Sequence, residues 1–207
     1  MKTPASPATA TNTATCKWFL DVSNIHWSAV QLAQERETAL AARSLRLHFD
    51  NLYSLLAGGR PETEGRAVGT MPAPVAAQMR RPNVEVTSLE PGAVSGREQG
   101  VDETLQVAIY QTAASERTGV ATVATGDGAG HHKARGFLPC IQQLRRVGWT
   151  VEVIAWAATC NSALRRFAEQ EGQFIALEDY YSSITFTGTR SARPLSLVHR
   201  RRGEVAR

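Results

Sequence analysis

The sequence has few cysteines and no long apolar run. Its three cysteines, Cys16, Cys140 and Cys160, are odd in number, widely spaced and form no Cys-x-x-Cys pair, so neither a disulfide framework nor a zinc site is predicted. No stretch approaches the roughly 18 to 20 apolar residues that a membrane-spanning helix needs. Residues 1–15, rich in Thr, Ala and Pro, lack the apolar segment of a secretory signal and are predicted to be a disordered leader. These features favour a cytoplasmic protein with reduced thiols and no membrane partner.

Two phosphate-binding signatures are also missing. The sequence contains neither a GxxxxGK[ST] phosphate loop nor a GxGxxG dinucleotide fingerprint. A small-molecule phosphohydrolase or a nucleotide-binding protein on an α/β sheet therefore lacks support, and a closed small pocket would be the feature favouring it. Ser23 and Ser28 do not lie in a nucleophile-elbow pattern, so no serine hydrolase is predicted.

Positive charge is concentrated at the end of the chain. The 207 residues carry a net charge of +4, and residues 187–207 contain six arginines against one glutamate, Glu204. We therefore divide the chain into the leader at 1–15, a domain at 16–186 and an Arg-rich tail at 187–207. Such a tail either holds RNA phosphates without reading sequence or is simply solvated.

Short apolar runs and helical periodicities alternate along the chain. Apolar or β-branched runs predict strands at 17–22, 66–70, 83–89, 119–125, 150–156 and 174–177. Apolar residues at helical spacing predict helices at 38–57, 72–81 and 101–115, between 137 and 148, and from about 161 to 170. This alternation is typical of a mostly parallel sheet with helices on both faces, so we predict a single α/β domain of Rossmann-like architecture.

Two aspartates follow predicted strands. Asp21 closes the first apolar run, and Asp127 lies between two glycines after the strand at 119–125. Each has a structural interpretation, because Asp21 can cap the next turn and Asp-Gly is an ordinary turn pair. In parallel sheets, however, sites form at the carboxyl ends of strands where the strand order reverses. The two side chains are therefore predicted to converge on one edge.

Asp102 is the third candidate. It lies at a predicted helix start, where the helix dipole favours a carboxylate by roughly 0.3–1 kcal/mol whatever its function. Three carboxylates at one edge would repel one another, and a divalent cation relieves that repulsion. An all-oxygen ligand set suits Mg²⁺ or Mn²⁺ rather than Zn²⁺. Asn24 either hydrogen-bonds a metal-bound water or a substrate phosphate, or is a turn residue.

Four stretches carry a family resemblance: Phe-Leu-Asp-Val-Ser-Asn-Ile at 19–25, Gln-Gly-Val-Asp-Glu-Thr-Leu at 99–105, Thr-Gly-Asp-Gly at 125–128 with Gly-Phe-Leu-Pro at 136–139, and Gly-Trp-Thr-Val-Glu-Val at 148–153. In order and spacing they resemble the NYN domain, a PIN-like family of metal-dependent ribonucleases, over roughly residues 17–180. The resemblance implies a PIN-like fold, a Mg²⁺- or Mn²⁺-dependent site, RNA as substrate and the homodimer that PIN-like domains often form. The matching site positions are Asp21, Asn24, Asp102 and Asp127.

Three positions depart from the family pattern. The family often has Lys where this chain has Gln99, a second acid where it has Ala129, and a further acid where it has Ala108. A thinner acidic cluster holds metal more weakly. We therefore keep a second interpretation, in which the same fold is a catalytically weakened module that binds RNA or protein.

The sequence thus predicts a metal-dependent ribonuclease. Asp21, Asp102 and Asp127 would hold the metal, Asn24 would assist, and single-stranded RNA would be the partner. The loop segment His131-His132-Lys133, together with Arg135, either contacts phosphate or assists proton transfer, or is ordinary exposed loop.

Overall fold

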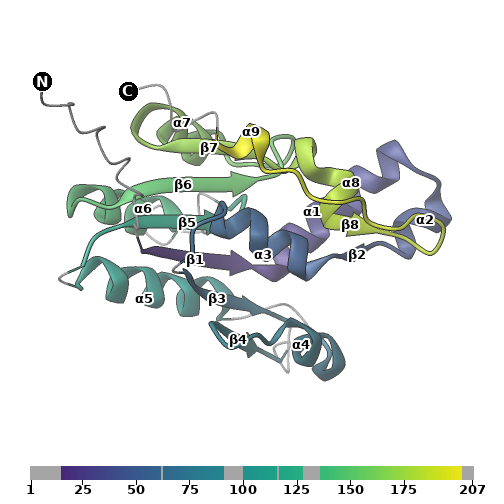
Figure 1. Cartoon of the computed structure of the whole chain (residues 1–207), viewed down its shortest axis with the longest axis horizontal. Coiled ribbons are helices and arrows are strands. Elements are labelled where there is room, and N and C mark those ends of the chain that lie inside the picture. Colours follow the sequence, from purple (N-terminus) through teal and green to yellow (C-terminus); the bar gives the residue numbers. More distant parts are fainter. Residues whose placement is uncertain (1–14, 62, 91–99, 116, 128–135, 202–207) are drawn as a thin grey trace, which may run out of the picture.

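A six-stranded parallel sheet forms the centre of the molecule (Figure 1), which is known from a computed structural model describing residues 15–61, 63–90, 100–115, 117–127 and 136–201. The strand order is β4-β3-β1-β5-β6-β7, and every neighbouring pair is parallel. The strands are β1 (Cys16–Asp21), β3 (Thr63–Gly69), β4 (Val84–Ser88), β5 (Val120–Ala124), β6 (Thr150–Ala155) and β7 (Gln173–Ala176). The α/β class and the parallel sheet predicted from the sequence are confirmed.

The strand order reverses beside the first strand. From β1 the chain moves outward to β3 and β4, then returns to place β5 on the other side of β1 and continues outward to β6 and β7. The carboxyl ends of all six strands lie at one edge, on the right in Figure 1. In doubly wound sheets the crevice for ligands forms at this reversal, outside the carboxyl ends of the strands. Here it falls between β1 and β5.

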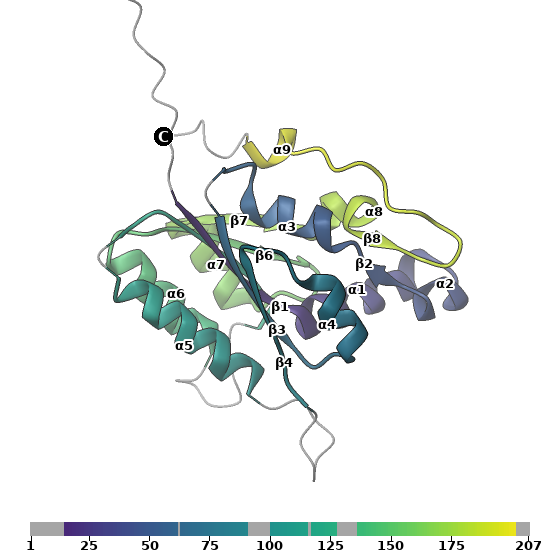
Figure 2. The ribbon, with the colours of Figure 1, turned by 60° about the horizontal axis from the view of Figure 1, so that its bottom comes forward.

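Helices cover both faces of the sheet (Figure 2). One face packs against α1 (Val22–Arg36), α2 (Ala39–Arg43), α3 (Phe49–Ala57), α4 (Ala73–Met79) and α8 (Tyr181–Ile184). The other packs against α5 (Val101–Ala113), α6 (Phe137–Arg146) and α7 (Ser162–Glu171). Side chains alternate along each strand, so Trp18 and Leu20 enter the first core layer while Phe19 enters the second.

The first two helical segments differ from the sequence prediction. The segment after β1 forms α1, which the sequence analysis did not identify. The single helix predicted at 38–57 is two helices, separated by the two-residue strand β2 (Arg46–Leu47), which pairs antiparallel with β8 (Thr185–Phe186). His48 begins α3 afresh, because its Nδ1 accepts a hydrogen bond of 3.3 Å from the Asn51 backbone amide. A distant strand and a local cap together outweigh continuous helical periodicity.

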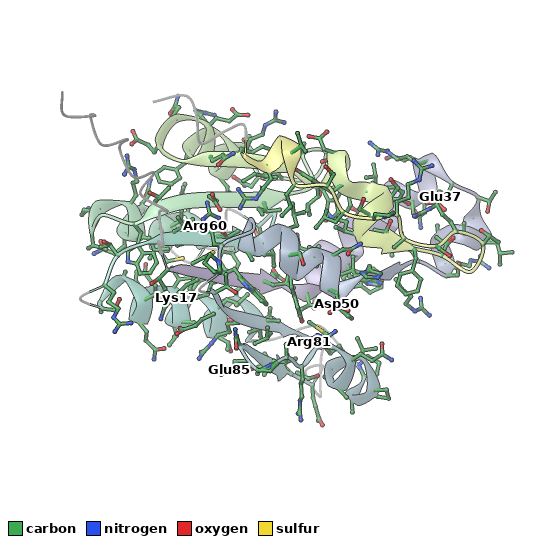
Figure 3. The ribbon with its side chains drawn as sticks, in the orientation of Figure 1. Lys17, Glu37, Asp50, Arg60, Arg81 and Glu85 are labelled. Carbon is green, nitrogen blue, oxygen red and sulfur yellow. The ribbon has the colours of Figure 1, made fainter. Side chains whose placement is uncertain are left out.

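The carboxyl-terminal segment, as far as it is described, packs against the domain at several points. After η1 (Leu177–Tyr180), α8 and β8 it ends in α9 (Val198–Arg201). Arg190 pairs with Glu37 at 2.9 Å, and Arg200, 2% exposed, pairs with the buried Glu152. Arg60, labelled in Figure 3, reaches the same Glu152 carboxylate at 2.8 Å. Two arginines that the sequence analysis counted in a basic tail therefore hold the fold.

No helix within the described ranges is both long and apolar enough to span a bilayer.

Candidate functional site

Asp21 and Asp127 lie at the strand-order reversal, as the sequence predicted. Asp21 is the last residue of β1, and Asp127 follows the carboxyl end of β5 by three residues. The two strands are direct neighbours, with Leu20 opposite Ala124. The carboxyl edge therefore presents one aspartate from each side of the reversal.

Asp21 is only 4% exposed, and both of its carboxylate oxygens accept hydrogen bonds from the protein. It caps α1, where its Oδ1 accepts a hydrogen bond of 2.9 Å from the Asn24 amide. Its Oδ2 accepts a bond of 3.3 Å from the Thr125 hydroxyl. A buried carboxylate needs such donors, because burial without them is costly. Asp21 therefore does cap the turn that follows it. Each of its carboxylate oxygens already accepts one hydrogen bond, Oδ1 from the helix and Oδ2 from Thr125.

Thr125 connects the two aspartates. The hydroxyl that donates to Asp21 also accepts a hydrogen bond of 3.2 Å from the Asp127 amide. Thr125 is fully buried, so these bonds fix the backbone that carries Asp127. In the sequence this threonine stands out only as part of the Thr-Gly-Asp motif. Its role could have been inferred from its position, because its hydroxyl lies one residue after a buried strand and two residues before the aspartate.

Asn24 joins α1 to the loop after β5. Its Oδ1 accepts a hydrogen bond of 2.7 Å from the Gly126 amide, and the Gly126 carbonyl accepts one of 2.9 Å from the Asn161 amide. Asn161 in turn caps α7 through its own side chain. Asn24 is therefore a loop-holding residue. Only its Oδ1 is used to hold the loop, and no hydrogen bond joins its Nδ2 to a described residue.

Asp102 lies on the face of the sheet that Asp21 also uses. It is the second residue of α5 and is partly exposed. The helix begins directly after Gly100, whose φ of 83° requires a residue without a side chain. Alternation along β1 places Asp21 on the side of Phe19, which packs with α5 and α6. Asp102 therefore lies in the first turn of a helix that covers the same face of the sheet.

The donor set was tested against the expected divalent cation. Among the described residues, no group of three or more His, Cys, Asp and Glu side chains is arranged to hold a metal ion. The three aspartates thus do not form a closed, all-protein site there. Carboxylate oxygens nevertheless suit Mg²⁺ and Mn²⁺, and Mg²⁺ commonly binds through one or two carboxylates, waters and substrate phosphates. Asp21 and Asp127 fit that open type of site.

A further carboxylate at this edge was missed. Glu178, in η1, accepts hydrogen bonds of 2.9 and 3.0 Å from the Ala157 and Ala158 amides, in the loop that follows β6. That loop continues to Asn161 and so to the Gly126 carbonyl. Glu178 therefore shapes the wall of the edge on the β6 side. Nothing in the sequence indicated this contact, because α7 and β7 lie between β6 and Glu178 along the chain.

Several residues weighed in the sequence lie outside the described ranges. These are Gln99, Ala129, His131, His132, Lys133, Arg135 and all of the leader except Thr15. Ala108 is described and is a buried core residue of α5. An acid at that position would enter the core, so the departure from the family pattern at Ala108 is compatible with packing.

Comparison of the chain with protein-family models, with curated proteins and with solved structures finds no match in any of the three. The resemblance to the NYN domain therefore stays a prediction that stands on the four sequence stretches.

Proposed function

We propose that the chain is a metal-dependent ribonuclease that hydrolyses RNA phosphodiester bonds at the carboxyl edge between β1 and β5. One observation carries the proposal: Asp21 and Asp127 follow neighbouring strands where the strand order reverses, and the Thr125 hydroxyl bonds both the Asp21 carboxylate and the Asp127 backbone amide. The expectation that the substrate is RNA and the cation Mg²⁺ or Mn²⁺ comes from the four stretches that resemble the NYN domain. The fold alone does not assign an activity, since many activities share it.

Each side chain has a separate task in this proposal. Asp21 and Asp127 would hold Mg²⁺ or Mn²⁺, and Asp102, at the start of α5, would add negative charge on the same face of the sheet without completing a three-carboxylate ligand set among the described residues. When bound there, such a cation would supply a water of lowered pKa and would stabilise negative charge on the phosphate. Asn24 positions the Gly126 backbone through its Oδ1, and its Nδ2 donates to a phosphate oxygen of the substrate.

Electrostatics support RNA only in part. The chain has a net charge of +4, but Arg190 and Arg200 are engaged by Glu37 and Glu152 and are not available to phosphates. Arg193 is exposed, and no side-chain hydrogen bond or ion pair joins it to a described residue. RNA affinity is therefore assigned mainly to the edge itself and less to the carboxyl-terminal segment than the sequence suggested.

A catalytically weakened RNA-binding or protein-binding module is the second candidate. The lack of a three-carboxylate group among the described side chains favours it. It differs from the first candidate in one measurable respect, because binding would persist while metal-dependent cleavage would be absent.

The test is cleavage of a labelled single-stranded RNA with Mn²⁺, Mg²⁺ or EDTA. Wild type is compared with Asp21→Asn, Asp127→Asn and the control Asp179→Asn, an exposed aspartate in η1. Asn caps helices about as well as Asp, so Asp21→Asn removes charge while α1 keeps its cap. We expect cleavage that needs metal, is lost in both edge variants and survives in Asp179→Asn. RNA binding without cleavage in all four proteins would refute the ribonuclease proposal and leave the binding module.

A further inference from the structure

A cavity of about 470 Å³ opens immediately beside the acidic edge. It lies between the first turns of α1, the loop after β3, α4 and the β2–β8 ribbon. Its lining includes Ser23, His26, Trp27, Arg46, Met71 and Phe186. The volume falls within the roughly 300–1,000 Å³ of small-ligand pockets, which combine apolar walls with a few polar groups.

The cavity adjoins Asp21 through the first turn of α1. Val22 and Ser23, the two residues after Asp21, both line it. The next residue, Asn24, turns the other way and binds the Gly126 amide. The first turn of α1 therefore has the cavity on one side and the candidate hydrolytic edge on the other, only a few residues apart.

Trp27 is an unusual component of this wall. Its residue surface is 65% exposed, whereas the other three tryptophans of the chain, Trp18, Trp149 and Trp156, are at most 2% exposed. Its ring lies 5.9 Å from that of His26 at an interplanar angle of 65°. Large exposed aromatic side chains next to a pocket are typical of binding surfaces. Aromatic rings also provide the faces on which the bases of single-stranded nucleic acids stack.

Arg46 adds positive charge to the rim. It is exposed, its Nη1 donates 2.8 Å to the Leu45 carbonyl, and no carboxylate among the described residues pairs with it. His26 is also in the wall, and burial lowers its pKa from the ordinary value. The charge of Arg46 lowers this pKa further, and a hydrogen bond with the Leu45 backbone raises it by less than these two effects together. The neutral form of the ring is therefore favoured near neutral pH. The rim thus offers one cation for a phosphate and neutral rings for a base.

We propose that this cavity binds one unpaired nucleobase of the RNA strand whose backbone passes the Asp21–Asp127 edge. The base stacks against Trp27, and its phosphate lies near Arg46. This inference rests on the proposed function, because it names the part of the substrate that occupies the neighbouring cavity. It selects single-stranded over duplex RNA, since a paired base cannot enter.

The test uses the full chain in EDTA, so that binding is read without cleavage. Binding of every protein to a fluorophore-labelled short single-stranded oligoribonucleotide is measured by anisotropy, with inorganic polyphosphate as a competitor. Tryptophan emission of wild type is titrated separately with the oligoribonucleotide and with polyphosphate. Trp27→Ala and Arg46→Gln are compared with wild type and with Tyr110→Ala, whose aromatic side chain is 45% exposed on α5, away from the cavity. Thermal unfolding confirms that each variant is folded.

We expect RNA to quench wild-type emission, because Trp27 is the tryptophan that solvent reaches. Trp27→Ala should weaken RNA binding on the order of tenfold and leave polyphosphate binding unchanged. Arg46→Gln should weaken both, and Tyr110→Ala neither. RNA that binds Trp27→Ala as tightly as wild type, or polyphosphate that quenches emission as strongly as RNA, would overturn the inference.

These outcomes separate the two proposals. If RNA quenches the emission and Trp27→Ala weakens RNA binding, but the chain never cleaves RNA, the base cavity is supported and the ribonuclease proposal is refuted. Metal-dependent cleavage that is identical in wild type and Trp27→Ala, with no quenching, would do the opposite.

Discussion

Replacing Arg200 by methionine is expected to destabilise the fold severely, although Arg200 lies far along the chain from any strand it supports. Its guanidinium donates to both oxygens of Glu152, and its Nε donates 3.2 Å to the Leu55 carbonyl. Both side chains of this pair are 1% exposed. Glu152 lies on β6 and also accepts 2.8 Å from the Thr122 hydroxyl on β5. Arg200 therefore holds α9 and α3 against the middle of the sheet.

The size of the effect follows from burial. Removing one partner of a buried ion pair typically costs about 3–5 kcal/mol, mostly because a charge is left without compensation. Arg60 still neutralises Glu152 in the variant, from 2.8 Å, which places the expected loss near the low end, about 3 kcal/mol. Since domains are stable by roughly 5–15 kcal/mol in total, such a loss is a large fraction of the whole.

Urea unfolding followed by circular dichroism measures this loss. With a slope of about 2 kcal/mol per M urea, the midpoint should fall by roughly 1.5 M. Arg193→Met is the matched control, an exposed arginine of the same segment, and should change stability by less than about 0.5 kcal/mol. Equal midpoints for the two variants would refute the ion-pair argument.

The same pair gives a pH dependence with a definite sign. Burial opposes ionisation of Glu152, but the hydrogen bond and charge of Arg200, together with the charge of Arg60, outweigh it and lower the pKa below its ordinary value of 4.5. A carboxyl whose pKa is lower in the folded state contributes stability above the unfolded value and loses it as pH falls through the folded one. Wild type should therefore lose stability as the solution is acidified below about pH 4.5, and Arg200→Met should lose less over that range.

Three further predictions concern the edge and its neighbour. Asn24→Ala leaves the Gly126 amide without its 2.7 Å acceptor and should cost about 1 kcal/mol in urea unfolding; an unchanged midpoint would mean that the loop is held otherwise. The folded-state pKa of His26 is below its ordinary 6.5, so the unfolded state binds its proton first and stability should decrease as pH falls below 6.5, a decrease that His26→Gln should reduce. EDTA should leave the thermal midpoint unchanged, because Asp21 is already satisfied by protein donors; a large drop would indicate a tightly bound structural cation.

The strands of the sheet could be predicted because each is a local signal. The runs at 119–125 and 150–156 are apolar on both faces, as buried parallel strands require, and became β5 and β6. Helix α1 was missed since Asp21 and Asn24 were interpreted as turn or site residues, whereas Asp21 is also the cap that starts the helix.

Long-range contacts explain what the sequence could not give. The break in the predicted 38–57 helix depends on Thr185–Phe186 pairing with Arg46–Leu47, some 140 positions later in the sequence. Arg200 was indistinguishable from a solvated tail residue, because its partner Glu152 lies on β6 and looked like an ordinary polar position of that strand. No local pattern reports that two charges become buried together.

The thin acidic cluster is consistent with a fold that does not require its cation. Asp21 sits at the start of α1, where the helix dipole favours a negative charge, and receives hydrogen bonds from the Asn24 amide and the Thr125 hydroxyl. Its charge is therefore stabilised before any cation binds. Asp127 is less buried than Asp21. An edge stabilised in this way can remain open until a phosphate supplies the remaining oxygens, whereas a cluster of three or four crowded acids would need a resident metal to relieve their repulsion. Under the proposed function, substrate and cation binding would therefore depend on each other at this edge, since each would supply charge that the other needs.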